Sequence, residues 1–120
     1  MSIEGIVFST LKGLVPLTGG GGKVYPDVND AGTAAPYIVY NRAGGASPAL
    51  LENALPSKDT ARLQVTCWHS TRTGAQALRE QVLTALVALG WRPIGGSVSL
   101  QDSTTKLRGA AQDFFAFADR

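Results

Sequence analysis

Hydrophobic and polar residues alternate most regularly in residues 62–69. One side of this stretch carries the apolar residues Leu63, Val65 and Cys67. The other side carries Arg62, Gln64, Thr66 and Trp68. Because a strand turns alternate side chains to opposite faces, the pattern predicts a half-buried strand whose second face is polar except for Trp68.

The period becomes helical directly after this strand. Ser70, Thr71 and Thr73 are N-cap candidates, since their hydroxyl groups can accept from the free amides of a first helical turn. Apolar residues then recur at steps of three and four, namely at Ala75, Leu78, Val82, Ala85, Leu86 and Leu89. Gly90 suits the left-handed position that follows a helix, and Pro93 prevents continuation. We expect the helix to pack on the apolar face of the strand.

The remaining elements follow from the same patterns. Residues 3–15 have helical spacing, with Ser2 as N-cap and Pro16 after the end. Residues 24–26 predict a short edge strand, and residues 36–42, 97–101 and 108–118 predict three further strands. The expected core is Ile38, Tyr40, Leu78, Val82, Leu86 and Phe114. The order of elements predicts one α+β domain over residues 1–120, with a mainly antiparallel sheet of about four strands and both helices on one face.

The sheet face away from the helices is expected to expose an apolar patch. Residues 44–58 (GGASPALLENALPSK) predict a mobile loop or hairpin arm, whose leucines fold back on the core or dock on a neighbour. Since soluble monomers seldom expose a large apolar patch, we predict a subunit interface formed by this sheet face and the arm. Its residues are Tyr37, Val39, Leu50, Leu51, Leu55, Trp68, Phe115 and Phe117. The alternative is a three-layer monomer in which the N-terminal helix or the arm covers this face.

Composition excludes more than it suggests. The net charge is +2 and lysines and arginines form no run, so composition gives no argument for nucleic-acid binding. Cys67 is the single cysteine and cannot form an internal disulfide; we expect a buried thiol in a reducing compartment. No apolar run approaches the roughly 20 residues of a membrane span. The N-terminal residues lack the basic region of a signal peptide.

Candidate chemistry is equally sparse. The glycine-rich TGGGGK segment fails as a phosphate-binding loop, because Leu17 and Val24 occupy its first glycine and its Ser/Thr position. A dyad of Cys67 and His69 is not expected, on the premise that adjacent strand positions face opposite ways. Cysteine and histidine show no metal-ligand spacing. We therefore expect no enzymatic activity, no cofactor and no metal.

Four segments together resemble the tail-completion proteins of long-tailed bacteriophages, which are related to the tail terminators. The usual pattern has a VYP segment, a P-x-I-x-Y strand, a strand ending in C-W, an Ala-rich helix and a strand with D-F. Here these parts are residues 24–26, 36–40, 63–68, 75–88 and 113–114. The sequence departs from the pattern in its four-glycine loop before Val24. It departs again at Ala110, Ala111 and Gln112, where larger apolar residues are common and the core is expected to be thinly packed.

The resemblance implies a structural role without reaction or cofactor. Family members form a ring, typically of about six subunits, at the head-proximal end of the tail tube. The implied partners are other copies of the chain, the major tail tube protein and the head-connector protein. The implied location is the virion tail, with assembly in the host cytoplasm.

Two other classes of function stay open at this stage. One is a small cytoplasmic protein-binding domain that uses the same aromatic sheet face. The other is an α/β plait that stacks single-stranded RNA on Trp68 and Phe115, with Arg62 contributing charge and Asp113 opposing it. No sequence-specific nucleic-acid or membrane partner is expected.

Overall fold

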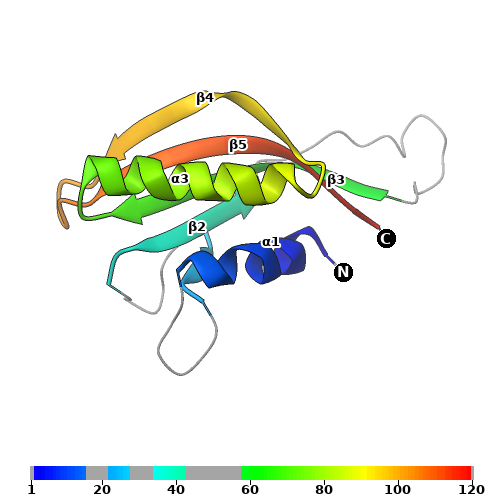
Figure 1. Ribbon diagram of the computed structural model, residues 1–120, viewed down its shortest axis with the longest axis horizontal. Helices are drawn as coiled ribbons and strands as arrows, with labels where there is room; N and C mark the ends of the chain where they lie inside the picture. Colours follow the sequence, from blue (N-terminus) through cyan, green and yellow to red (C-terminus); the bar gives the residue numbers. More distant parts are fainter. Residues whose placement is uncertain (1, 16–21, 28–33, 43–57, 120) are drawn as a thin grey trace.

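The computed structural model describes residues 2–15, 22–27, 34–42 and 58–119. The elements follow the order α1 (Ile3–Leu11), η1 (Lys12–Leu14), β1 (Val24–Pro26), β2 (Tyr37–Arg42), β3 (Lys58–His69), α3 (Arg72–Val87), β4 (Arg92–Gln101) and β5 (Arg108–Asp119). The strands form one five-stranded sheet in the order β1-β2-β3-β5-β4. Both α1 and α3 lie on the same face of this sheet (Figure 1). The α+β prediction is confirmed, with five strands rather than four.

The sheet is antiparallel except at one edge. β2 and β5 pair antiparallel with the central β3, β4 pairs antiparallel with β5, and only the β1–β2 pair is parallel. In the long β3–β5 ladder Leu63 lies opposite Phe114 and Val65 opposite Gln112. Residues directly opposite in an antiparallel pair share a face. The predicted apolar face of β3 therefore continues into β5.

α3 begins and ends for local reasons. Thr71 is the N-cap, and its side-chain oxygen accepts a hydrogen bond of 3.0 Å from the Gly74 amide. The helix ends at Val87 with Ala88 as C-cap, and Gly90 takes the left-handed φ of 89°. The placement of Leu89 in the buried stripe was wrong, because Leu89 lies beyond the helix and is 39% exposed.

α1 is shorter than the predicted helix over residues 3–15. Ser2 caps it by accepting from the Gly5 amide, as the sequence indicates. The α-helical hydrogen bonding ends at Leu11, and Lys12–Leu14 continue as one 3₁₀ turn. Tighter turns of this kind are common at helix ends.

The core lies between the helices and the sheet, and it contains all six predicted core residues, Ile38, Tyr40, Leu78, Val82, Leu86 and Phe114. It also contains Trp91, which is 2% exposed and donates its indole N–H to the Phe117 carbonyl at 3.0 Å. The sequence analysis did not predict Trp91, because it began the fourth strand at residue 97. β4 in fact begins at Arg92, and a bulge between Ile94 and Val98 interrupts its alternation.

Candidate interaction surface

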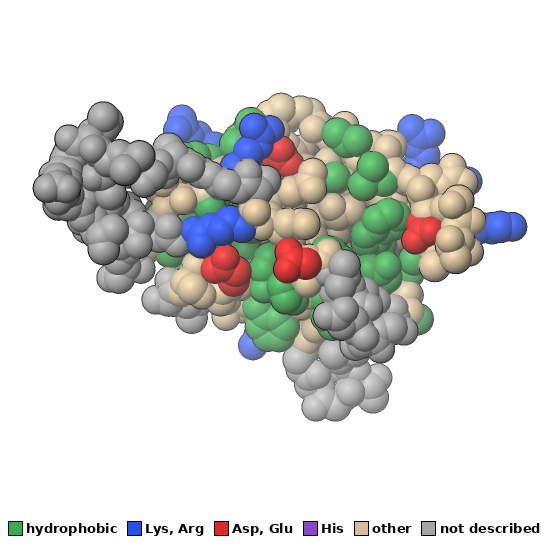
Figure 2. Space-filling view, turned by 180° about the vertical axis from the view of Figure 1, so that it is seen from behind, with side chains coloured by type: hydrophobic (Ala, Val, Ile, Leu, Met, Phe, Trp, Pro, Cys, Tyr) green, Lys and Arg blue, Asp and Glu red, His purple; other side chains and the backbone are tan. Residues whose placement is uncertain are grey.

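The sheet face away from the helices is lined by residues that strand parity assigns to it. In the ladders Tyr37 lies opposite Trp68, and Val39 lies opposite Thr66. The same rows continue through Gly109 and Ala111 of β5 to Leu100 and Val98 of β4. Figure 2 shows this face from outside, with hydrophobic side chains gathered over the half towards the β4–β5 hairpin. We call the aromatic and aliphatic side chains on this side the outer apolar face. They are those of Tyr37, Val39, Trp68, Val98, Leu100, Phe115 and Phe117.

The predicted interface residues differ in how much surface they offer. Phe115 is 38% exposed, and Tyr37, Trp68 and Phe117 are each partly exposed. Val39 lies on the same face but is only 7% exposed, so it contributes little accessible area. Leu50, Leu51 and Leu55, together with the arm that carries them, lie outside the described residues.

The sequence analysis did not predict two exposed residues of the outer apolar face. Val98 is 55% exposed and Leu100 is 39% exposed, and both lie on the outer apolar face. The SVSLQ pattern predicts a strand at residues 97–101 but does not say which of its sides shares a face with Trp68. Only the pairing of Val98 with Ala111, in register with Thr66, decides this.

Trp68 is held against the backbone of a neighbouring strand. A Cβ atom added at Gly109 would lie 3.0 Å from two ring atoms of Trp68, so the ring lies directly over this glycine. Glycine allows a ring to approach the backbone this closely, whereas a side chain at the same position would displace the ring. The position of the Trp68 ring therefore depends on the absence of a side chain at Gly109.

The other half of the outer face carries one ion pair and one arginine that lies over an aromatic ring. Arg62 makes two contacts to the same Asp113 carboxylate oxygen, at 2.9 Å from Nε and 2.7 Å from Nη2. The Arg92 guanidinium lies over the Phe115 ring, 5.9 Å from its centroid. Arg62 is thus engaged by the acidic residue expected to oppose it. This half offers an anion less free charge than the sequence alone suggests.

The N-terminal helix does not cover this face. α1 packs beside α3 on the opposite side of the sheet, where Ile3, Val7 and Leu11 join the core (Figure 1). Two segments were considered as covers of this face in a three-layer monomer. The prediction that α1 is the cover was therefore wrong. The other, residues 44–58, lies mainly in a segment that is not described.

Cys67 and His69 have no arrangement suited to catalysis. They are two positions apart in β3, so alternation puts them on the same side, and the premise of opposite faces was wrong. Burial nevertheless raises the pKa of the Cys67 thiol to about 12, so a thiolate nucleophile is disfavoured at neutral pH. His69 Nδ1 instead accepts from the Thr71 amide at 3.3 Å.

Other sites were sought in the described part of the chain. No group of three or more His, Cys, Asp or Glu side chains gathers there as metal ligands would. Neither α1 nor α3 has the length and hydrophobicity that crossing a bilayer requires.

The family described as tail completion protein gp17 matches residues 7–119. The matched region includes the whole sheet and α3. The chain belongs to this family of phage tail completion proteins. Tail completion proteins are structural components of the bacteriophage tail. Membership of this family places the chain in the virion tail, among other tail and head components. A search of curated proteins finds no match.

Proposed function

We propose that this tail completion protein caps the tail tube as a ring, of about six copies, and presents a surface to the head connector. It acts by contact with protein alone, without catalysis or a cofactor, and assembles in the host cytoplasm. Its partners are neighbouring copies, the tail tube protein and the head-connector protein. The outer apolar face and the leucines Leu50, Leu51 and Leu55 form the contact between subunits.

One observation supports this proposal above the others. Val98, Leu100 and Phe115 are large apolar side chains that are all more than a third exposed on one sheet face, beside the partly exposed Trp68. Exposed apolar groups gathered on one face are typical of protein contact sites. A ring needs heterologous contacts, in which one patch of each subunit meets a different patch of the next. The face of one copy and the arm of its neighbour supply two such patches.

The test is the substitution Trp68→Ala, because tryptophan anchors at interfaces typically cost about 2 kcal/mol or more of binding free energy when truncated. We expect the variant monomer to stay folded, and tail tubes assembled with it to have uncontrolled lengths. Thermal stability of the monomer and the length distribution of tubes are measured on the same preparation. Phe8→Ala is the matched control, since Phe8 is an exposed aromatic residue of α1 in the helical layer.

Two outcomes contradict the proposal. If Trp68→Ala unfolds the monomer, Trp68 acts as a core residue and the covered-face interpretation is preferred. If stability and tube length both stay normal, the interface lies elsewhere on the molecule. Tubes that lose length control with Phe8→Ala as well would show that the assay responds to any loss of an aromatic side chain.

A small protein-binding domain using the same face is the second candidate, and a pull-down that returns only host proteins would favour it. RNA binding by an α/β plait is disfavoured by the Arg62–Asp113 pair, because Asp113 neutralises the arginine that was expected to contribute charge. A binding titration against salt separates RNA binding from assembly, because neutralised phosphates give a steep dependence on salt concentration.

A further inference from the structure

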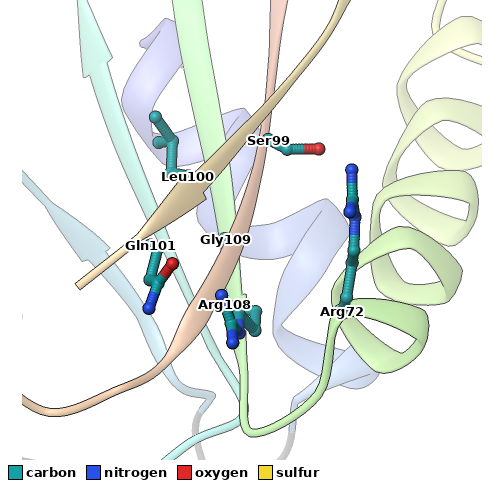
Figure 3. A pocket seen from close by; sticks show the side chains of 6 residues that line it. All are labelled: Arg72, Ser99, Leu100, Gln101, Arg108 and Gly109. Carbon is teal, nitrogen blue, oxygen red and sulfur yellow. The ribbon is translucent and has the colours of Figure 1, made fainter. Parts of the chain in front are cut away.

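A polar pocket lies on the helical side of the sheet, at the end where β4 turns into β5. Its volume is about 190 Å³, and it is lined by Arg72, Ser99, Leu100, Gln101, Arg108 and Gly109. Arg72 belongs to the first turn of α3, and Arg108 is the first residue of β5. Figure 3 shows the Arg72 side chain standing beside the end of β4, where Ser99 points to its side, and Arg108 lying next to Gln101.

The two arginines of this pocket differ from the others that the structure describes. Arg42, Arg62 and Arg79 each lie within salt-bridge distance of a carboxylate, those of Glu4, Asp113 and Glu80. Arg92 lies over the Phe115 ring.

Neither Arg72 nor Arg108 has such a partner in the described part of the chain. Of the two acidic residues nearest to Arg108 in sequence, Asp113 pairs with Arg62. Asp102 has one carboxylate oxygen occupied by the Thr104 and Thr105 amides. The pocket therefore holds two guanidinium groups, a hydroxyl group and a carboxamide that lack an internal anion.

We propose that this pocket binds a carboxylate side chain presented by a neighbouring protein subunit. Guanidinium groups pair with carboxylates through parallel N–H donors, and the Ser99 hydroxyl and the Gln101 amide supply further donors to the same oxygens. The pocket is smaller than the roughly 300–1,000 Å³ that encloses a whole small molecule. It has room for one side chain and none for a nucleotide cofactor.

A protein carboxylate fits better than a nucleic-acid phosphate. Nucleic-acid binding draws its affinity from the neutralisation of several phosphates along a backbone. The net charge of the chain is only +2, and the pocket is lined by two cations. This inference rests on the proposed function in one respect, since the neighbouring subunit is a protein of the assembled tail.

Binding is tested on the full chain with a defined probe, acetylated tetraglutamate amide, against the tetraglutamine amide as control peptide. We expect saturable shifts of the Arg72 and Arg108 Nε–H NMR signals, with a Kd on the order of 1 mM for so small a contact. Arg72→Gln and Arg108→Gln should each weaken the binding about tenfold. Arg79→Gln is the matched control, since Arg79 already pairs with Glu80, and it should bind normally.

A second arm identifies the source of the carboxylate. If the carboxylate belongs to another copy, Arg72→Glu combined with Arg108→Glu abolishes self-association of the chain in sedimentation. If it belongs to a different tail or head protein, the same variant self-associates normally and fails to join purified tails. Both results support the pocket.

Three results would overturn the inference. One is the absence of glutamate-dependent shifts. Another is tighter binding of a thymidine oligonucleotide with a steep salt slope, which would assign the pocket to phosphate. The third is normal self-association and joining by the doubly charge-reversed variant. In that case a failure of Trp68→Ala to cap tubes would leave the proposed function standing, so the two proposals fail separately.

Discussion

At the scale of single residues, the environment of a side chain decides its role more than its chemical type. Cys67 is a potential nucleophile by type, yet it is fully buried among apolar residues of the core. Trp68, its neighbour in sequence, lies on the opposite face of β3 and is partly exposed. One step along a strand thus separates a core residue from a contact residue.

The burial of Cys67 predicts a dependence of stability on pH. The thiol ionises near its ordinary pKa of 9.0 when the chain is unfolded, and near 12 when it is folded. Because the native pKa is raised, the contribution of this thiol is fully present below pH 9 and is lost progressively as pH rises towards 12.

The free energy of unfolding of the wild type should therefore fall over this range relative to that of Cys67→Val, measured by urea denaturation at pH 8 and 10.5. Parallel pH profiles for the two proteins would show that the thiol ionises as easily in the native state as in the unfolded chain.

At the scale of elements, β4 is the strand that the alternation of polar and apolar residues predicts least well. Pro93, Gly95 and Gly96 break the alternation, so the sequence indicates only the second half of the strand. Gln112 of β5 compensates for the irregularity. Its Nε2 donates to the carbonyls of Ile94 and Gly95 at 3.2 and 3.1 Å, and Gln112 is itself 4% exposed. The sequence analysis expected thin packing of the core here. It did not consider that the polar side chain of Gln112 holds the bulge of β4 by hydrogen bonds.

The substitution Gln112→Leu tests this role. It keeps the approximate size of the side chain but removes the donor, so the Ile94 and Gly95 carbonyls lose a partner. Because Ile94 is only partly buried and Gly95 is exposed, these carbonyls can turn to water. A typical intramolecular hydrogen bond contributes about 0.5–1.5 kcal/mol, and we expect a loss of unfolding free energy of about this size by urea denaturation. Amide exchange should quicken around residues 94–98. Gln64→Leu is the control, since Gln64 is exposed on β3, and an equal loss in that variant would argue against the bulge contacts.

At the scale of the whole molecule, the sheet has two unlike faces. One is covered by α1 and α3 and forms the core, and the other carries the outer apolar face and its paired charges (Figures 1 and 2). Membership of the tail completion family implies interaction with other tail and head components, and the outer apolar face is the surface that we propose for contact between subunits. The arginine pocket lies on the helical side, so the two proposed contacts address different neighbours or different parts of one neighbour.

This arrangement predicts that a charge on the outer apolar face blocks assembly with little effect on folding. Val98→Asp should change the free energy of unfolding by about 1 kcal/mol or less, because the side chain is exposed and strand propensities span about that range. The variant should fail to cap tail tubes, as seen by electron microscopy. Val87→Asp, at an exposed valine of α3, should cap normally. Capping by Val98→Asp would exclude this half of the face from the interface.

The sequence by itself determined the features that rest on local periodicity. Alternation at Leu63, Val65 and Cys67 and the stripe of α3 were enough to predict the buried faces, and Thr71 was among the predicted helix caps. These patterns work because side-chain direction repeats with a period set by the backbone of each element.

The tertiary structure alone decided which distant residues meet. Strand register places Val98 and Leu100 on the same sheet face as Trp68. The packing of distant elements buries Trp91 in the core and brings Arg72 of α3 to the pocket that Arg108 of β5 also lines. Register depends on pairing between segments that lie far apart in the chain, and a shift of one residue would turn every side chain of a strand to the other face. No local pattern carries that information.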